Sequence, residues 1–307
     1  MSYVNNDITA IGSTSATETE NAFLSQECGM SSRPVALVTG ASRGIGKACV
    51  LALASVGFDL AFTARTAKEG EGRDDSDAGG GAIIEGSLEQ TAVEAEALGA
   101  TTLPFVADLL DFDSLRAAVA STVETWGRLD VLVLNAVHTG AGSMLRVADT
   151  PVEVLQTKLT ANAVAQLVLV QAALPTMLAS GGGRIIGITS FVATNNPPAP
   201  VGEGGWGYTY AASKAAFHRL AGNLAVELGP QGIVAINVDP GHVVTERMAA
   251  NAARLGLDGH YQGAPPSAPA AAVAWLATSP DAVELNGQTV NGLKLVLEKS
   301  LHPDWRT

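Results

Sequence analysis

The chain has 307 residues, with 18 lysine and arginine residues against 30 aspartate and glutamate residues, which gives a formal net charge of −12. A chain this acidic has no general attraction for nucleic acid or anionic lipid, so neither is an expected partner. Hydrophobic residues make up 47% of the chain, which suits one large globular domain with a well-buried core, or at most two domains.

Neither export nor membrane insertion is expected. The longest apolar stretch, 163–174, is interrupted by two glutamines and is too short to span a bilayer. The residues before Arg33 include no lysine or arginine and no apolar core segment, which argues against a secretory signal. Cys28 and Cys49 make no disulfide framework, and no cysteine–histidine cluster has zinc spacing. We therefore expect a soluble, cytoplasmic protein without a metal site.

The two ends of the chain differ in composition from its middle. Residues 1–33 are rich in Ser, Thr, Asn and Glu and carry few large apolar side chains, which predicts a flexible or loosely docked extension. Strand and helix patterns alternate from residue 34 to residue 298, which we take as the main domain. Residues 299–307 are left as a short tail.

The main domain begins with a pattern typical of dinucleotide-binding proteins. The apolar run 34–39 predicts a buried strand, a glycine-rich turn (GASRGIG) follows, and a helix is expected from about 47 to 56. Glycines let the backbone approach a pyrophosphate, and the helix N-terminus offers free N–H groups and a positive dipole end. The candidate phosphate contacts are Gly40, Ser42, Arg43, Gly44, Ile45 and Gly46.

The second strand, 58–64, bears on the choice of cofactor. In folds of this type an acidic residue often ends this strand and holds the ribose 2′-hydroxyl of NAD. Here Arg65 follows the strand and Arg43 lies in the glycine turn, and two guanidinium groups without a carboxylate suit the 2′-phosphate of NADP. The alternative is that both arginines merely face solvent. The polar, glycine-rich segment 68–81 predicts a mobile loop beside this end of the site.

Two further polar positions follow predicted strands. A capping box at 87–90 opens a helix that runs to 98, and the third strand, 102–107, ends at Asp108 and Leu109. The Asp108 carboxylate is placed either to accept from an adenine amino group or to cap the next turn before the helix 114–126. The fourth strand, 131–136, ends in Asn135 and Ala136, where open α/β sheets bind ligands.

The next helix contains a residue that does not favour helices. Asn162 lies inside the helical segment 151–173, although its amide competes for backbone hydrogen bonds. That mismatch is a hint of function or of a local kink. The fifth strand, 184–190, then ends at Ser190, and a Pro/Gly-rich loop follows at 195–207.

A tyrosine and a lysine four residues apart lie on the helix that ends near residue 228. Tyr210 and Lys214 share one helix face, with β-carbons roughly 5–6 Å apart. Holding a tyrosine half-ionised at pH 7 needs about 4 kcal/mol, and one ammonium at about 4 Å supplies about that much at an effective dielectric of about 20. The pair therefore suits acid–base work at an alcohol or carbonyl group. The alternative is a plain packing pair with a solvated amine.

The remaining elements complete an alternating pattern. We expect a sixth strand at 233–238, an irregular segment at 242–266 as the candidate substrate lid, a helix at 267–278 and a last strand at 287–296. Alternating strands and helices imply a parallel sheet with helices on both faces, joined by right-handed crossovers. The predicted fold is α/β, a single doubly wound sheet.

The assembled motifs resemble the short-chain dehydrogenase/reductase family over about residues 34–298. The late segment of the chain adds Pro240, Gly241, Val243 and Thr245, which fit the Pro-Gly motif of that family. Asp108 and Leu109 fit its adenine-side motif, Asn135 and Ala136 its Asn-Ala motif, and the turn at 39–46 its glycine motif. The catalytic residues of the family correspond here to Asn162, Ser190, Tyr210 and Lys214.

The resemblance implies a Rossmann-type sheet of seven strands and a role for each catalytic residue. Tyr210 would be the general acid or base, and Ser190 would donate to the substrate oxygen. Lys214 would hold the nicotinamide ribose and lower the tyrosine pKa, and Asn162 would hold a water that relays protons. The resemblance also implies a homodimer or homotetramer.

The chain departs from the pattern of this family at three places. Val137 and His138 stand where a glycine usually follows the Asn-Ala motif, and His138 reads as a plain pocket residue rather than a second acid. The spacing from Ser190 to Tyr210 is longer than usual, so the loop 195–207 is expected to shape the substrate entrance. The segment 291–293 replaces the usual acidic ending.

The sequence thus favours an NADP(H)-dependent oxidoreductase that interconverts a ketone or aldehyde and an alcohol. Two alternatives stay open. One is a catalytically silent, NADP-binding regulatory protein of the same fold, which need not keep the four catalytic residues. The other is a lyase or epimerase that uses bound cofactor transiently, although such relatives usually have a larger C-terminal domain.

Overall fold

The computed structural model describes residues 33–254 and 263–305. The predicted N-terminal extension lies outside the described residues except for Arg33. So do residues 255–262 of the expected substrate lid and the last two residues of the tail.

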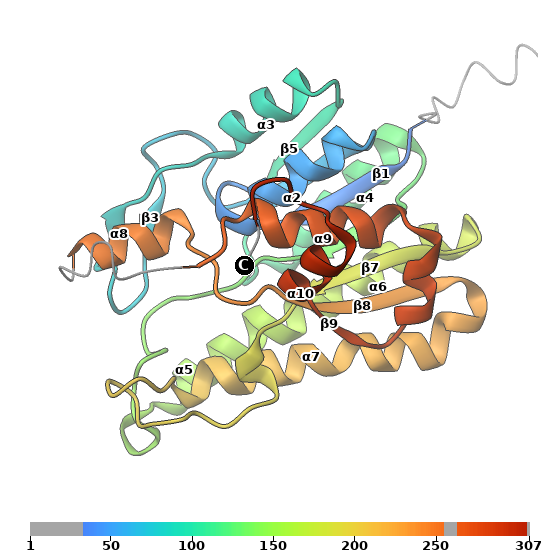
Figure 1. Cartoon of the computed structure of the whole chain (residues 1–307). Helices are drawn as coiled ribbons and strands as arrows, with labels where there is room; N and C mark the ends of the chain where they lie inside the picture. Colours follow the sequence, from blue (N-terminus) through green and yellow to red (C-terminus); the bar gives the residue numbers. More distant parts are fainter. Residues whose placement is uncertain (1–32, 255–262, 306–307) are drawn as a thin grey trace, which may run out of the picture.

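The centre of the molecule is a seven-stranded sheet with the order β5-β2-β1-β6-β7-β8-β9 (Figure 1), and every neighbouring pair is parallel. The strand order reverses between β1 and β6, which is where open α/β sheets bind ligands at the carboxyl ends. This confirms the predicted Rossmann-type fold. The strands are β1 (Val35–Thr39), β2 (Asp59–Ala64), β5 (Thr102–Val106), β6 (Val131–Leu134), β7 (Gly183–Ile188), β8 (Ile233–Asp239) and β9 (Thr289–Asn291).

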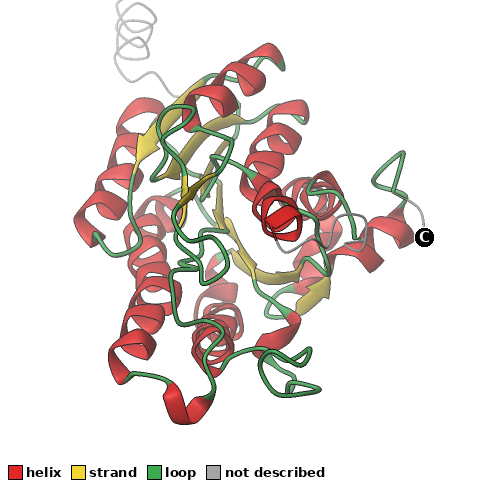
Figure 2. Ribbon diagram, turned by 90° about the vertical axis from the view of Figure 1, so that its left-hand side faces the viewer, coloured by secondary structure: helices red, strands yellow, loops and turns green. Residues whose placement is uncertain are grey.

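Helices cover both faces of this sheet, as Figure 2 shows. Successive side chains of a strand point to opposite faces, so Ala36 and Val38 join one core while Val35 and Leu37 join the other. One core is closed by α2 (Gly44–Ser55), α3 (Leu88–Ala97), α9 (Ser267–Thr278) and α10 (Gly292–Lys299). The other is closed by α4 (Phe112–Trp126), α6 (Ala165–Ala179) and α7 (Tyr208–Leu228), with α5 (Val152–Leu159) packed on α7.

The long helix predicted around Asn162 is interrupted where the sequence signalled it. Between α5 and α6 the residues Thr160–Val164 form a π-helical segment, and Asn162 lies inside it. The whole run, Val152–Ala179, is long and apolar enough to cross a membrane by length and composition alone. Half of its apolar window is buried inside the structure, however, and buried core helices pass the same test.

Side-chain caps fix the start of two helices on opposite faces. Ser87 accepts from the backbone N–H of Gln90 at 3.1 Å, as the capping box predicts, and α3 begins at the next residue. Asp111 accepts from the N–H groups of Asp113 and Ser114 at 3.2 Å each. The helix α4 therefore begins at Phe112, two residues before the predicted start.

Two segments that were expected to be irregular contain regular elements. The loop expected at 68–81 instead contains β3 (Arg73–Asp74), which pairs in antiparallel fashion with β4 (Ala82–Ile83). The irregular segment expected at 242–266 contains the helix α8 (Glu246–Arg254), which begins beside Thr245. Short 3₁₀ turns lie at Val147–Asp149, Phe191–Ala193, Gly229–Gln231 and Pro280–Leu285.

The last strand is the clearest error of the sequence analysis. Only Thr289–Asn291 pair with β8, whereas a strand was expected from 287 to 296. Asn291 ends the strand because its side-chain oxygen accepts from the N–H of Lys294 at 2.9 Å and so caps α10. Leu293, Leu295 and Val296 of the expected strand lie in α10 instead, where Leu295 and Val296 are buried in the core.

Candidate active site

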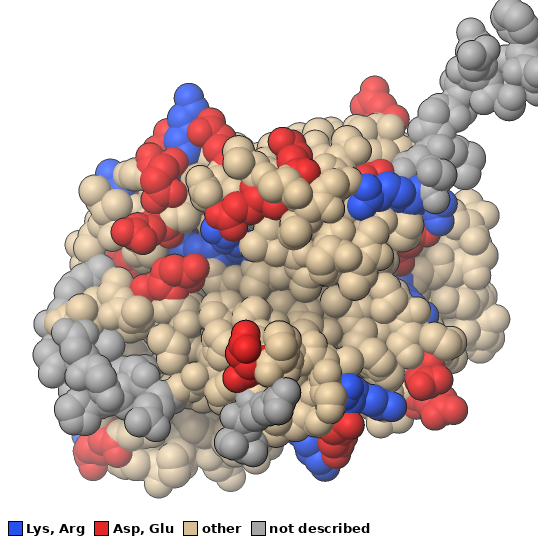
Figure 3. All heavy atoms as spheres, turned by 45° about the horizontal axis from the view of Figure 1, so that its top comes forward, with Lys and Arg blue, Asp and Glu red and all other residues tan. Residues whose placement is uncertain are grey.

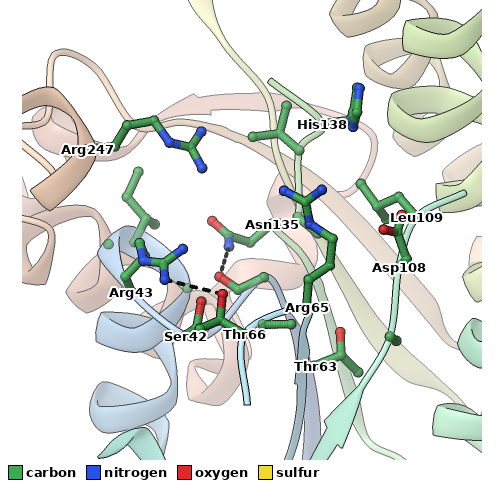
Figure 4. A pocket seen from close by; sticks show the side chains of 18 of the residues that line it. Ser42, Arg43, Thr63, Arg65, Thr66, Asp108, Leu109, Asn135, His138 and Arg247 are labelled. Atoms are coloured by element: carbon green, nitrogen blue, oxygen red, sulfur yellow. Dashed lines mark hydrogen bonds between the residues drawn. The ribbon is translucent and has the colours of Figure 1, made fainter. Parts of the chain in front are cut away.

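A cavity of about 420 Å³ opens at the carboxyl ends of the central strands (Figure 4). It lies between the glycine turn after β1, the end of β2, the segments after β5 and β6, and the start of α8. Most of the predicted cofactor residues meet there. The lining includes Gly40, Ser42, Arg43, Gly44, Ile45, Gly46, Arg65, Asp108, Leu109, Asn135, Ala136 and Thr245.

The glycine turn is held close to β6 by its lack of side chains. A β-carbon on Gly46 would lie 2.2 Å from the Gly40 carbonyl oxygen, so no larger residue fits there. Asn135 Nδ2 donates to the carbonyls of Thr39 and Gly40 at 2.8 and 3.1 Å, which fastens the turn to the neighbouring strand. The N-terminus of α2, a helix of 12 residues, is thereby aimed at the cavity. These features fit a dinucleotide pyrophosphate.

A carboxylate already lies at this helix end. Glu246 Oε2 accepts from the backbone N–H of Gly44 at 2.9 Å, at the N-terminus of α2. The next residue, Arg247, donates from Nη1 to Thr139 Oγ1 at 2.5 Å, after β6. The helix α8 thus contacts both the glycine turn and the β6 loop across the cavity. A pyrophosphate on the Gly44 N–H would have to displace the Glu246 carboxylate.

Charges of both signs surround the cavity. Figure 4 shows Arg43, Arg65 and Arg247 pointing toward its interior from three different elements. Acidic and basic side chains are likewise interspersed over the face of the molecule seen in Figure 3. The charged lining residues are Arg43, Arg65, Arg73, Arg247, Glu71, Asp75, Asp108 and Glu246.

The two arginines that predicted NADP are placed differently from one another. Arg43 donates from Nε to the Glu85 carbonyl at 2.7 Å and from Nη2 to the Gly86 carbonyl at 2.7 Å. Arg65 instead pairs with Asp75, with Arg65 Nη2 and Asp75 Oδ2 3.0 Å apart. The premise that no carboxylate lies at this end of the site is therefore wrong. The acidic run at 74–77 was the sequence signal that could have revealed it.

The sequence left two roles open for Asp108, a contact to adenine and the capping of the next turn. Its Oδ1 accepts from the N–H of Leu110 at 2.9 Å, so it does cap the next turn. The residue also lines the cavity, which leaves a place on its carboxylate for a ligand donor. Pro240, Gly241 and Val243 lie outside the lining; Gly241 has φ +68°, and Val243 bridges to Ala264.

The four predicted catalytic residues lie beyond the lining of this cavity and come from three elements. Tyr210 and Lys214 are on α7, Ser190 follows β7, and Asn162 is in the π-helical segment. Ser190 caps the 3₁₀ turn Phe191–Ala193, which packs against α7, and it lies close enough to Tyr210 to act on the pKa of that side chain. Lys214 Nζ donates to the Ile188 carbonyl at 2.8 Å, and Lys214 is buried. The structure therefore brings tyrosine, serine and lysine together at the carboxyl end of β7.

Burial dominates the proton equilibria of this group. It raises the pKa of Tyr210 above its ordinary value, and the hydrogen bond with Ser190 offsets only part of that rise. It lowers the pKa of Lys214 from 10.5 to about 8, because desolvation disfavours the ammonium. The lowering of the Tyr210 pKa that was expected from Lys214 is not found in this structure. At pH 7 the tyrosine is protonated and the lysine is mostly charged.

Asn162 connects the cavity wall to the catalytic helix. Its Oδ1 accepts from the N–H of His138 at 2.7 Å, and its Nδ2 donates to Ser213 Oγ at 3.1 Å. Ser213 Oγ in turn donates to the Tyr210 carbonyl at 2.9 Å. The π-helical segment is what places this amide between β6 and α7, a common use of such segments at functional sites.

His138 lines the cavity beside this link. Burial, and then the positive charge of Lys158, lower the pKa of its ring below the ordinary value. A ring that is neutral at pH 7 is a poor proton donor, which agrees with its interpretation as a pocket residue.

One buried cation escaped the sequence analysis. Lys158 on α5 is 1% exposed and donates to Gly140 O and, at 2.8 Å, to Ser143 Oγ. Thr209 Oγ1 donates to the Gly142 carbonyl at 3.0 Å from the start of α7. The segment after β6 is therefore fixed from two sides, next to the catalytic helix. A lysine in an amphipathic helical pattern gives no sign that it is buried.

Comparison with known proteins places this site in a family. A sequence profile described as short chain dehydrogenase matches residues 81–255. The chain is also 33% identical to L-rhamnose 1-dehydrogenase (NAD(P)(+)) of Sphingomonas sp. over 211 residues, which cover 68% of this chain and 72% of that protein. The chain belongs to the short-chain dehydrogenase/reductase family. Membership supports NAD(P)-dependent oxidation and reduction of alcohol and carbonyl groups.

Two further members extend the similarity over most of the chain. A 3-oxoacyl-acyl-carrier-protein reductase of Synechocystis sp. is 31% identical over 265 residues, covering 84% of this chain and 94% of that protein. The crystal structure of a 3-oxoacyl-acyl-carrier-protein reductase from Brucella melitensis in complex with NAD superposes with a TM-score of 0.69. It is 28% identical and covers 86% of this chain and 98% of that one.

Proposed function

We propose that this short-chain dehydrogenase/reductase is an NADP(H)-dependent enzyme that interconverts a ketone or aldehyde and an alcohol. Residues 34–298 form its catalytic unit in this proposal. The observation that carries it is that Tyr210, Ser190 and buried Lys214 meet at the carboxyl end of β7, where Lys214 Nζ donates to the Ile188 carbonyl at 2.8 Å. This group lies at the same edge of the sheet as the cavity.

The nicotinamide supplies or accepts the hydride when the cofactor is bound. Reduction builds negative charge on the carbonyl oxygen, which the hydroxyl groups of Ser190 and Tyr210 stabilise by donating hydrogen bonds. Because burial keeps the pKa of Tyr210 high, this side chain holds its proton at pH 7 and donates it to that oxygen. In the oxidation direction Tyr210 accepts the proton that the alcohol group loses.

Asn162 acts in this proposal by positioning. Its amide holds the segment after β6 against α7 through His138 and Ser213. One acceptor lone pair on Oδ1 is left for a water that relays protons toward Lys214.

The preference for NADP(H) depends on Arg65. It follows β2, and its guanidinium points into the cavity. Arg43 supports the same end of the site from the glycine turn, although two of its nitrogens bind backbone carbonyls. A guanidinium is suited to a phosphate because it presents a planar fork of donors.

Titration of NADPH and NADH, followed by protein fluorescence, tests this assignment. Wild type should bind NADPH more tightly than NADH, and Arg65→Ala should weaken NADPH binding about tenfold to a hundredfold while sparing NADH. Arg116→Ala, at an exposed ion pair with Asp113 on α4, is the matched control. Equal effects of Arg65→Ala on both cofactors would contradict the preference.

We also propose that the enzyme is cytoplasmic and acts on a small carbonyl or alcohol substrate. We propose further that it forms homodimers or homotetramers. Val164 and Leu167 are 45% and 42% exposed, one turn apart on the helical run Val152–Ala179. Exposed apolar residues of this kind support self-association. Light scattering during gel filtration gives the oligomeric state directly.

A further inference from the structure

Residues 68–86, between β2 and α3, contain β3, β4 and three aspartates, and we call this segment the acidic hairpin. Figure 1 shows β3 beside α8, and both elements contribute residues to the cavity lining. Each aspartate contacts a different wall of that cavity. Asp75 pairs with Arg65 after β2, and Asp74 Oδ1 lies 3.8 Å from Arg247 Nε of α8. Asp77 reaches the segment after β6.

Asp77 fixes the acidic hairpin in place. Its two carboxylate oxygens accept from the backbone N–H groups of Gly142 at 2.6 Å and Met144 at 3.0 Å. The far end of the hairpin is held by Arg43, which binds the carbonyls of Glu85 and Gly86. Asp75 lies two residues before Asp77 and directly after β3, so its position beside Arg65 is set by the fold of the hairpin rather than by the ion pair alone.

The Asp75 carboxylate is only partly satisfied. Its Oδ2 contacts Arg65, whereas Oδ1 is buried and has no hydrogen-bond partner among the residues that the structure describes. Burial acts to raise the pKa of this carboxyl, but the charge and hydrogen bond of Arg65 outweigh it and hold the pKa below its ordinary value. The group is therefore ionised at neutral pH and lines the cavity.

We propose that Asp75 sets the cofactor selectivity of this enzyme by sharing Arg65 with the ligand. With NADH it accepts a hydrogen bond from the ribose 2′-hydroxyl. With NADPH it must give up Arg65, and its negative charge opposes the 2′-phosphate. The side chains of Arg65 and Asp75 are 49% and 34% exposed, and an ion pair this exposed is weak enough for a phosphate to replace it.

The proposal rests on the proposed function, because it assumes a dinucleotide at this end of the cavity. In addition, the selectivity between NADPH and NADH depends on the balance of two charged groups that come from different segments. Arg65 favours the phosphate, and Asp75, delivered by the acidic hairpin, favours the free hydroxyl. Changing Asp75 alone should therefore move the two affinities in opposite directions.

The test is to measure the Kd of NADPH and of NADH for wild type and Asp75→Asn. The substitution should lower the Kd of NADPH about tenfold and raise that of NADH a few-fold, because a charge is removed from the ribose end. Adenosine 2′,5′-bisphosphate and AMP, which lack the nicotinamide, should show the same opposite changes. Asp75→Glu keeps the charge and should stay close to wild type.

Asp113→Asn is the matched control, since it removes the carboxylate of an exposed ion pair on α4 and should change neither Kd. If Asp75→Asn leaves both values unchanged, or shifts both in the same direction as a loosened hairpin would, the proposal is overturned. If wild type binds neither dinucleotide, the proposed function fails and the inference falls with it. If Arg65→Ala fails to weaken NADPH binding, Arg65 is not shared with the 2′-phosphate, and the proposal is overturned even where Asp75→Asn separates the two cofactors.

Discussion

The catalytic end and the cofactor end of this site are built in different ways. Tyr210, Lys214 and Asn162 lie on long helical segments whose other residues form the core, and Lys214 and Asn162 are almost fully buried. The cofactor end is walled by the acidic hairpin and by α8, which meet through charged side chains. Arg65 and Asp75 there stay partly exposed.

The two ends differ in how strongly their charged groups are shielded from water. A buried charge is costly and keeps a shifted pKa, as Lys214 does. A partly exposed ion pair contributes at most about 1 kcal/mol and is easily exchanged for a ligand. We infer that the catalytic end is preorganised for proton transfer, whereas the cofactor end uses exchangeable contacts to select and admit the dinucleotide.

The largest effect is expected at the buried lysine. Lowering the Lys214 pKa from 10.5 to about 8 corresponds to about 3 kcal/mol at neutral pH. Lys214→Met should therefore raise the free energy of unfolding by up to about 3 kcal/mol at pH 7, less the lost bond to Ile188, while abolishing turnover. Urea denaturation of the cofactor-free protein measures this, with the exposed Lys294→Met as control.

The pH dependence gives the sign of this effect. The unfolded chain holds the lysine proton more tightly than the folded protein, so the destabilisation is fully present below about pH 8. It is lost as the pH rises toward 10.5, and the advantage of methionine should disappear there. A stability gap that is constant across this range would mean that packing, and not the buried charge, distinguishes the two side chains.

A smaller effect is expected at the helix end that faces the cavity. Glu246→Gln removes the negative charge from the Gly44 N–H, which the cofactor pyrophosphate would otherwise have to displace. The Kd of NADPH and that of NADH should both fall by a similar factor, about threefold to tenfold. Calorimetric titration checks this, with the exposed Glu124→Gln as control. Tighter binding of only one cofactor would place Glu246 in selectivity instead.

The parts of the molecule that could be predicted from sequence are those with local signals. Apolar β-branched runs predicted the central strands, and the glycine turn predicted the helix after it, because nearest neighbours decide those structures. That helix, α2, begins at Gly44, three residues before the expected start at about 47. Asn162 was singled out as a poor helix residue, and it lies in a π-helical segment. The tyrosine–lysine spacing likewise needed only helix geometry.

The features that were missed depend on distant partners. The acidic hairpin has the composition of a loop, and its antiparallel pair forms from Arg73–Asp74 and Ala82–Ile83. Asp75 contacts Arg65 only because the hairpin folds in this way. The residues next to β2 in the sequence therefore could not predict this ion pair. The last strand was predicted too long because a short apolar run fits a strand and a helix equally well. The side chain of Asn291 decides between them by capping the helix α10.

The central claim is that the enzyme transfers hydride to a carbonyl group with Tyr210 as the proton donor. The most direct measurement is an enzymatic reduction with NADPH that is deuterated at the transferred position. The enzyme is given a panel of small ketones and aldehydes, and mass spectrometry measures the mass of the alcohols formed. Wild type should give alcohol one mass unit heavier, and Tyr210→Phe should give about a hundredfold to ten-thousandfold less while still binding the cofactor. Labelled alcohol formed equally by both proteins, or by neither, would contradict the account.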